Sequence, residues 1–215
     1  MERIFEDFLA GADAALAVLG SSEVTGRWEA PSACEGFTVG GLAAHLGWQV
    51  QGAQRAVAAE RPAEGVVATE LTEHYGKSAW IGAGPDSAAN VAIRDTGEQR
   101  AQVGPVEVLR LTREARDYLA AQLTSLDAQE IVAMPWIEGR AMRLGDLLTT
   151  RLLELLIHTD DLAVSVGLDT PQATDSGYEA VIGLLARLSV GRHGPIPVLR
   201  ALSRAERAPE SIVAL

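Results

Sequence analysis

The sequence predicts an all-α protein built as a four-helix bundle. Three observations support this class. Apolar residues recur three or four positions apart over four long segments, which is the spacing of a helix face. Strand signals, meaning short alternating apolar and polar runs between turns, are almost absent. The irregular residues 61–104 separate the second long segment from the third, and this is typical of a bundle with one long crossover connection.

The first two helices have clear sequence limits. The first is predicted from the N-terminus to Gly20, a suitable C-cap, because its apolar side chains share helical spacing: Ile4, Phe5, Phe8, Leu9, Ala12, Leu16 and Leu19. The second is predicted to follow Thr38, a natural N-cap. Gly40 and Gly41 at its start are poor helix formers, and such glycines allow another backbone or a ligand to come close.

The crossover and the third helix follow. Short helices are expected near 68–80 and 86–101, joined by loops that several glycines and prolines indicate. The third long helix is predicted over 105–126, with Pro105 well placed in its first turn.

The C-terminal half contains the fourth long helix. Pro135 and Gly139 interrupt helical spacing, so an extended or hairpin-like connection is expected over 130–145. The fourth helix is predicted over about 144–166, and Gly167 ends it.

A short helical C-terminal extension is expected after the bundle. It consists of a helix over about 174–190 and a further short helix in the tail. The length of 215 residues suits one domain. We therefore expect a bundle over residues 1–168 and an extension over 169–215 that packs on the same domain.

Composition limits the partners and the location. The net charge of −11 disfavours nucleic acid, whose phosphates an acidic surface repels. A single cysteine, Cys34, excludes an intrachain disulfide and fits a reducing compartment. The acidic N-terminal segment does not resemble a secretory signal, and no apolar run approaches the roughly 20 residues of a membrane span. We expect a cytoplasmic protein with no membrane contact.

A polar stripe on the predicted fourth helix is the candidate site. Its members follow one another at steps of three and four, beside an apolar stripe: Leu147, Arg151, Glu154, His158, Asp161 and Ser165. Glu154 and His158 lie one turn apart and can both bind one metal ion. A third ligand must come from another helix, and His45 in the second helix is the best candidate.

Simpler interpretations of these residues remain open. A glutamate and a histidine four residues apart can form an ordinary side-chain pair worth a few tenths of a kcal/mol. Glu70 and His74 have the same spacing among polar neighbours, which favours a solvated helix face for that pair. His45 alone could equally be a hydrogen-bonded core histidine.

Two segments carry a resemblance to a known family. The stretches "CEGFTVGGLAAHL" and "MRLGDLLTTRLLELLIHTDDLAVSVGL" resemble the second-helix and fourth-helix motifs of the DinB-like superfamily, in particular its mycothiol-dependent maleylpyruvate isomerase branch. The resemblance spans residues 1–168. It implies a bundle that holds one divalent ion, usually zinc, through His45, Glu154 and His158. It also implies a role for Asp161 in orienting His158 or handling a proton.

The resemblance also implies a chemistry. Three protein ligands leave a coordination position open, which is typical of catalytic zinc sites. A low-molecular-weight thiol such as mycothiol would be the cosubstrate, and a small electrophile would accept its sulfur by S-transfer or thiol-assisted isomerisation. Isomerases of this family carry a larger C-terminal domain, whereas this chain has only a short tail, so the isomerase reaction itself is not inherited.

Four further residues have open roles. Arg151 could bind a substrate carboxylate, although an ion pair with Glu154 or Asp146 is the favoured interpretation. Gln49 and Trp48 could line a pocket one turn beyond His45, with core packing as the simpler role for Trp48. We interpret Cys34 as structural, because a nucleophilic role would need a lowered pKa.

Two other functions compete with the thiol enzyme. A non-enzymatic metal-binding stress or interaction protein would retain the metal site without a reaction. A non-haem iron oxygenase would use the same set of two histidines and one carboxylate. An exposed apolar face in the 172–215 tail would in addition support a homodimer.

Overall fold

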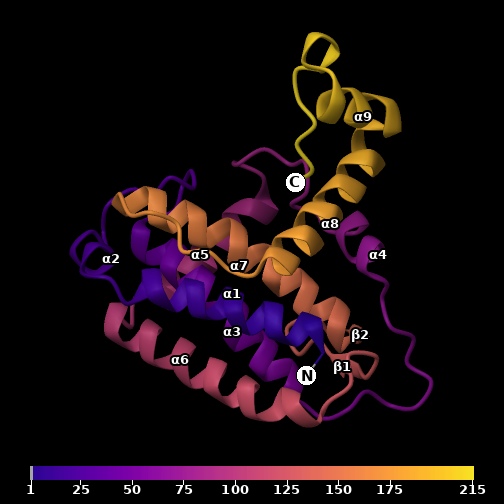
Figure 1. Ribbon diagram of the computed structural model, residues 1–215. Coiled ribbons are helices and arrows are strands. Elements are labelled where there is room, and N and C mark those ends of the chain that lie inside the picture. The colour runs from indigo at the N-terminus through magenta and orange to yellow at the C-terminus, as the bar shows by residue number, and fades with distance from the viewer. Residues whose placement is uncertain (1) are drawn as a thin grey trace.

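Four long helices form the body of the protein (Figure 1). A computed structural model describes residues 2–215, and the four helices are α1 (Arg3–Leu19), α3 (Val39–Ala58), α6 (Pro105–Gln122) and α7 (Leu144–Val166). Helices α1 and α3 each pack against both α6 and α7, so the four helices surround one core. The predicted all-α bundle and its long crossover are confirmed.

The apolar stripes of the four helices meet in this core. Its largest fully buried side chains come from every helix of the bundle: Phe5, Phe8, Leu42, Leu46, Leu119, Leu147 and Leu148. Full burial of a leucine or phenylalanine side chain stabilises the fold by roughly 1.5–3 kcal/mol. The core therefore fixes the positions of α3 and α7, the two helices that carry the candidate site.

The start of α3 shows why two glycines occur there. The Thr38 hydroxyl accepts a hydrogen bond from the Gly41 amide at 2.9 Å, so the predicted N-cap is confirmed. A Cβ atom at Gly40 would lie 2.6 Å from the Trp28 ring, and one at Gly41 would lie 2.1 Å from the Glu98 carboxylate. The sequence predicted the close approach of another backbone or a ligand, whereas the structure places the side chains of Trp28 and Glu98 against these glycines.

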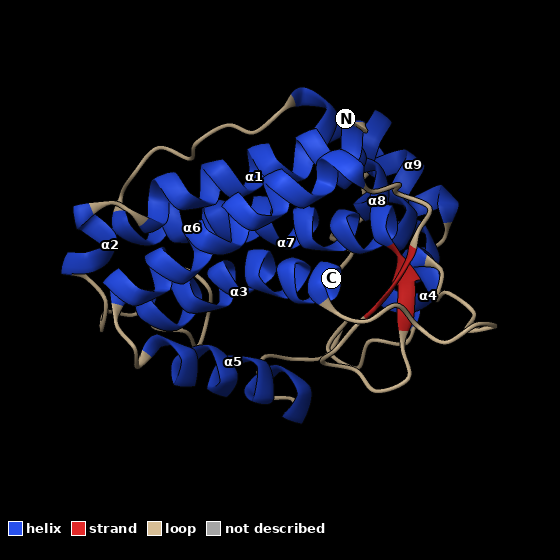
Figure 2. Cartoon of the chain, turned by 90° about the horizontal axis from the view of Figure 1, so that it is seen from below, coloured by secondary structure: helices blue, strands red, loops and turns tan. Residues whose placement is uncertain are grey.

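The crossover covers one side of the bundle with two helices, α4 (Leu71–Gly76) and α5 (Ala88–Ala101). Helix α5 packs along α3, on the outside of the bundle (Figure 2). Helix α4 is shorter than the predicted 68–80, because the chain leaves the helix at Gly76 and continues in turns. A short helix that the sequence did not predict, α2 (Ser22–Gly26), follows α1, and the Ser21 side chain caps it.

A hairpin leads into α7. Strand β1 (Ile131–Ala133) pairs antiparallel with β2 (Ala141–Arg143), and Gly139 adopts a positive φ of 69° in the turn between them. The hairpin expected from Pro135 and Gly139 is thus confirmed. Because β2 continues directly into α7, the hairpin holds the N-terminal end of that helix.

Two helices follow the bundle, α8 (Asp175–His193) and α9 (Pro195–Ser203), and a 3₁₀ turn covers Ala205–Arg207. The first part of α8 packs on α1 and α7, and the helix then extends away from the bundle toward α9 (Figure 1). The carboxylate of Asp7 in α1, itself 3% exposed, accepts hydrogen bonds from Thr174 and Ser176 at 2.5 Å each.

Helix α9 exposes a row of apolar side chains. Ile196, Leu199 and Leu202 are 52%, 61% and 71% exposed. The predicted apolar face is present, and a homodimer through it stays a prediction. None of the helices within residues 2–215 has both the length and the apolar character that a bilayer span requires.

Candidate metal centre and cavity

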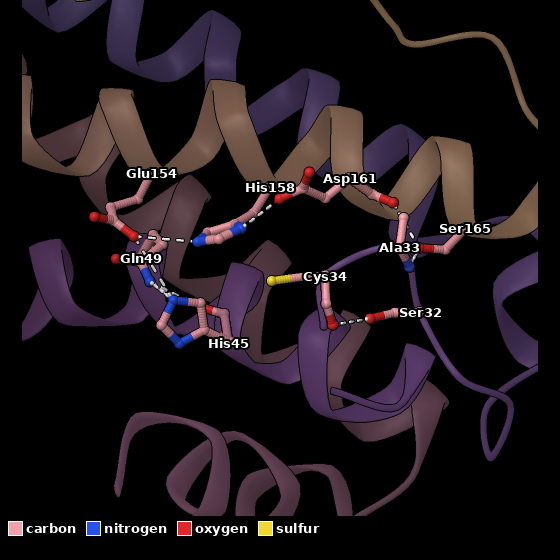
Figure 3. A network of polar contacts seen from close by, with 9 residues as sticks. All are labelled: Ser32, Ala33, Cys34, His45, Gln49, Glu154, His158, Asp161 and Ser165. Carbon is pink, nitrogen blue, oxygen red and sulfur yellow. Dashed lines mark hydrogen bonds and ion pairs between the residues drawn. The ribbon is translucent and has the colours of Figure 1, made fainter. Parts of the chain in front are cut away.

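Two helices bring three potential ligand atoms together (Figure 3). His45 projects from α3, and Glu154 and His158 project from α7. Atom Oε2 of Glu154 lies 3.7 Å from Nε2 of His45 and 3.3 Å from Nε2 of His158. The two imidazole rings meet edge to face, with their centroids 4.9 Å apart.

The spacing of these donor atoms fits a small divalent cation. All three lie within 4.8 Å of one another and are mostly shielded from solvent. Tetrahedral bonds of about 2.1 Å place neighbouring ligand atoms roughly 3.4 Å apart, close to the two distances from Glu154. Two imidazoles and one carboxylate are also a donor set that zinc and related ions prefer.

The electrostatics of the cluster favour a neutral His45 and an ionised Glu154. Burial lowers the pKa of His45, and the nearby Glu154 carboxylate only partly opposes this effect. Burial alone would raise the pKa of Glu154, but the two histidines outweigh it and hold that pKa well below its usual value. A neutral imidazole and a carboxylate are the protonation states that a metal ligand needs.

Asp161 fixes the orientation of His158. Its Oδ2 atom lies 2.9 Å from Nδ1 of His158, so Nδ1–H donates to Asp161 while Nε2 faces Glu154. Burial opposes a charge on His158, but the two carboxylates outweigh burial and raise its pKa to about 9. A carboxylate behind the imidazole is common in metal sites, because it fixes the tautomer of the ligand.

Arg151 and Gln49 form a second polar link to His45. The Arg151 guanidinium donates to Oε1 of Gln49 at 2.7 Å, and the Gln49 amide donates to Nε2 of His45 at 3.1 Å. No carboxylate of residues 2–215 lies within 4.0 Å of the guanidinium, since Asp146 pairs with Arg143. The favoured interpretation of Arg151 as an ion-pair partner of Glu154 or Asp146 was therefore wrong.

Cys34 lies beside this cluster, which the sequence reasoning missed. Its sulfur points toward the His158 ring in Figure 3, and it lies within 4.8 Å of ligand atoms of His158 and Asp161. Burial, with the nearby Asp161 charge, raises the thiol pKa to about 11, so the side chain is a neutral thiol. The only sequence signal for this position was the place of the cysteine just before α3.

A cavity of about 950 Å³ opens onto the cluster. Its walls come from α3, α7, the hairpin and both crossover helices. Trp48 lies on this wall rather than in the core, with the Trp136 ring 6.1 Å away and the Arg100 guanidinium 3.9 Å above it. The structure thus places Gln49, Trp48 and Arg151 around the same space as His45, Glu154 and His158.

The second Glu-His pair is not a solvated helix face, contrary to the prediction. Glu70 is exposed and pairs with Arg143 at 2.9 Å, but His74 is only 8% exposed and lines the cavity. Its neighbour Tyr75 is 2% exposed and lines the cavity as well. The aromatic side chains of His74, Tyr75 and Trp80, close together in the sequence, were the available sign that this turn is buried.

Replacing Asp161 with asparagine should weaken metal binding by roughly 10–100-fold, because His158 loses the carboxylate that orients it. The asparagine keeps the size of the side chain, so the fold should be unchanged. Competition with a chromophoric chelator measures the affinity. Asp160→Asn is the matched control, since Asp160 is exposed and bonds only Thr170. Equal affinities of the two variants would contradict the assigned role.

Comparison with known proteins identifies a family. A family model described as the mycothiol maleylpyruvate isomerase N-terminal domain matches residues 8–163, which include all three potential ligands. Searches of curated proteins and of solved structures gave no match.

Proposed function

Because the chain belongs to the family of the mycothiol maleylpyruvate isomerase N-terminal domain, we propose that it is a metal-dependent thiol S-transferase or thiol-assisted isomerase. Its cosubstrate is a low-molecular-weight thiol such as mycothiol, and its second substrate is a small electrophile. One observation carries the proposal: the cluster of His45, Glu154 and His158 faces a cavity of about 950 Å³.

The three clustered residues would hold zinc or another divalent ion. Such a cation supplies positive charge that lowers the pKa of an adjacent thiol, so that the thiol reacts as a thiolate. Asp161 holds the proton on Nδ1 of His158 and keeps Nε2 turned toward Glu154. Gln49, which is itself fixed by Arg151, donates to the backbone carbonyl of His45 and so holds this turn of α3.

The proposed reaction forms one bond between sulfur and carbon. The thiol loses its proton, and the sulfur adds to an electrophilic carbon of a double bond. In a transfer reaction, a proton is then added to the neighbouring carbon. In an isomerisation, the carbon–carbon bond rotates and the same sulfur–carbon bond breaks, which regenerates the thiolate. The partly buried walls of the cavity shield the reactive sulfur from water.

The cavity favours this function over a purely structural metal protein. A protein that used the bundle only to dock partners would not need a cavity of this size next to the potential metal ligands. Ligand sites typically occupy about 300–1,000 Å³, and this cavity lies within that range. A non-haem iron oxygenase would use the same ligands, so elemental analysis must accompany any activity measurement.

Cobalt substitution tests the proposal. We expect the cobalt(II) protein to develop a near-ultraviolet sulfur-to-cobalt absorption band when mycothiol is added, and to consume mycothiol with a reactive electrophile from a panel. Glutathione serves as the comparison thiol. Stoichiometric metal without a spectral change or thiol consumption would rule out the thiol enzyme and favour a non-enzymatic metal protein. Native protein loaded with iron would favour the oxygenase.

A further inference from the structure

The cavity has a basic wall in an acidic protein. Four arginines line it, Arg94, Arg100, Arg140 and Arg151, against two carboxylates, Glu35 and Glu154, although the chain has a net charge of −11. Within residues 2–215, no carboxylate lies within 4.0 Å of any of these four guanidinium groups. A partly buried arginine without a counterion favours an anionic ligand, because the anion replaces its lost hydration.

The α4 end of the cavity contains two buried polar atoms without partners. Nδ1 of His74 and the hydroxyl of Tyr75 make no hydrogen bond, although the residues are 8% and 2% exposed. Both residues line the cavity, and their rings contact each other edge to face at 5.2 Å between centroids. Nearly all buried polar groups in proteins are hydrogen-bonded, so these two atoms are candidates for contact with a ligand that binds at this end of the cavity.

The protonation states at this end define what the ligand must offer. Burial raises the pKa of Tyr75, so the phenol keeps its proton and donates a hydrogen bond. Burial, reinforced by the charges of Arg151 and Arg140, lowers the pKa of His74 to about 4, so its ring is neutral. Arg151 can only donate. The Tyr75 hydroxyl and the Arg151 guanidinium therefore favour a ligand group that accepts hydrogen bonds and carries negative charge, and the neutral His74 ring can donate from one of its nitrogens.

We propose that Arg151, Tyr75 and His74 form a subsite that binds a carboxylate group of the electrophilic substrate. Arg151 is linked through Gln49 to His45, and it lies one helical turn before Glu154 on α7. A carboxylate held by Arg151 therefore leaves the rest of the molecule next to the proposed metal ligands. Assigning this carboxylate to the electrophile rests on the proposed function, whereas the anion subsite itself does not.

Binding of succinate to the metal-free protein of 215 residues tests the subsite. Uncharged succinamide has a similar size and shape and serves as the comparison ligand. Isothermal titration calorimetry should detect succinate and give at least tenfold weaker binding for succinamide. Equal binding of the two ligands, or no binding of succinate, would overturn the proposal.

Two variants locate the binding. Arg151→Met should weaken succinate binding at least tenfold. Tyr75→Phe should also weaken it by about tenfold or more, as expected for the loss of one hydrogen bond to a charged group. The controls are Arg113→Met, which removes an exposed charge outside the cavity, and Tyr178→Phe, which removes a hydroxyl on α8. Loss of binding in the controls, or unchanged binding in the two cavity variants, would overturn the proposal.

Thermal melting separates a ligand role of Tyr75 from a structural one. Removal of a buried hydroxyl without a partner relieves a desolvation cost, so Tyr75→Phe should raise the melting temperature of the free protein by about 2–4 °C. A lower melting temperature would show that the hydroxyl stabilises the fold and would contradict the proposal. These measurements use metal-free protein and no thiol. They can therefore support the anion subsite even if the proposed thiol chemistry is ruled out.

Discussion

Replacing His45, Glu154 or His158 should remove the metal from the protein. We expect His45→Ala, Glu154→Gln and His158→Ala to lower the metal content from about one ion per chain to less than a tenth, which corresponds to a loss of affinity of more than about 100-fold. The reason is geometric: each residue supplies one of three ligand atoms that lie within 4.8 Å of one another. With only two protein ligands left, water molecules replace the protein in the coordination of the ion and the ion dissociates.

Elemental analysis of the purified variants measures this effect. Glu154→Gln is the most informative variant, because it keeps the volume of a buried side chain and removes only its charge. His193→Ala is the matched control, since His193 lies outside the cavity and contacts the backbone of Val213. Circular dichroism should show unchanged helix content. Full metal content in His45→Ala would contradict a metal site shared between two helices, because His45 lies on α3 whereas Glu154 and His158 lie on α7.

Replacing Leu152 with alanine should destabilise the whole chain by about 3–5 kcal/mol. Leu152 is fully buried where α7 meets both α1 and α8. Its two methyl groups lie 2.7 Å and 3.6 Å from the Cβ positions that Gly11 of α1 and Gly177 of α8 would have. Removal of a buried leucine leaves a cavity that a tightly packed junction cannot close, which explains the expected size of the loss.

Gly11→Ala tests whether Leu152 packs directly against this position of α1. Gly11→Ala alone should destabilise the protein slightly, because its methyl group would displace the end of Leu152. In the Leu152→Ala background, the same change should stabilise by about 0.5–1 kcal/mol, because the methyl group enters the cavity and alanine favours the helix. Urea denaturation measures both effects. An equal effect of Gly11→Ala in the two backgrounds would contradict the packing.

The same denaturation curves test the domain organisation that we expect. If residues 169–215 form an extension of the domain that contains the bundle of residues 1–168, the chain should unfold in one transition, and Leu152→Ala should shift it as a whole. Leu199→Ala on α9 is the control. This side chain is 61% exposed, so its loss should change stability by no more than about 0.5 kcal/mol. Two separate transitions would show that the extension is an independent unit.

The charge of the cavity is a second feature of the candidate site, besides the three potential metal ligands. An acidic surface and an arginine-lined interior place the positive potential where a ligand can be enclosed. Trp48 and Trp136 form the apolar part of the same wall, with Arg100 above Trp48. Such a cavity combines apolar area with a few polar groups that orient a ligand, as small-molecule sites commonly do.

The helical periodicity determined most of the architecture. Spacing of apolar residues predicted α1, α3, α6 and α7, and local signals at Thr38, Pro105 and Gly167 predicted where three of them begin or end. These features depend on neighbours within one or two turns, so a single sequence is sufficient to identify them. The same logic placed Glu154, His158 and Asp161 on one face of α7, because residues three and four apart share a helix face.

Tertiary structure decided which polar residues share a site. His74 and Tyr75 lie in a short turn with polar neighbours, and only the packing of α4 against the bundle buries them. Arg151 was free to pair with a nearby carboxylate, but the fold placed Gln49 of α3 within its reach instead. Cys34 approaches His158 only because the loop before α3 passes over α7. Burial and contacts across helices depend on how distant segments pack, and a helix pattern contains no information about the residues that face it.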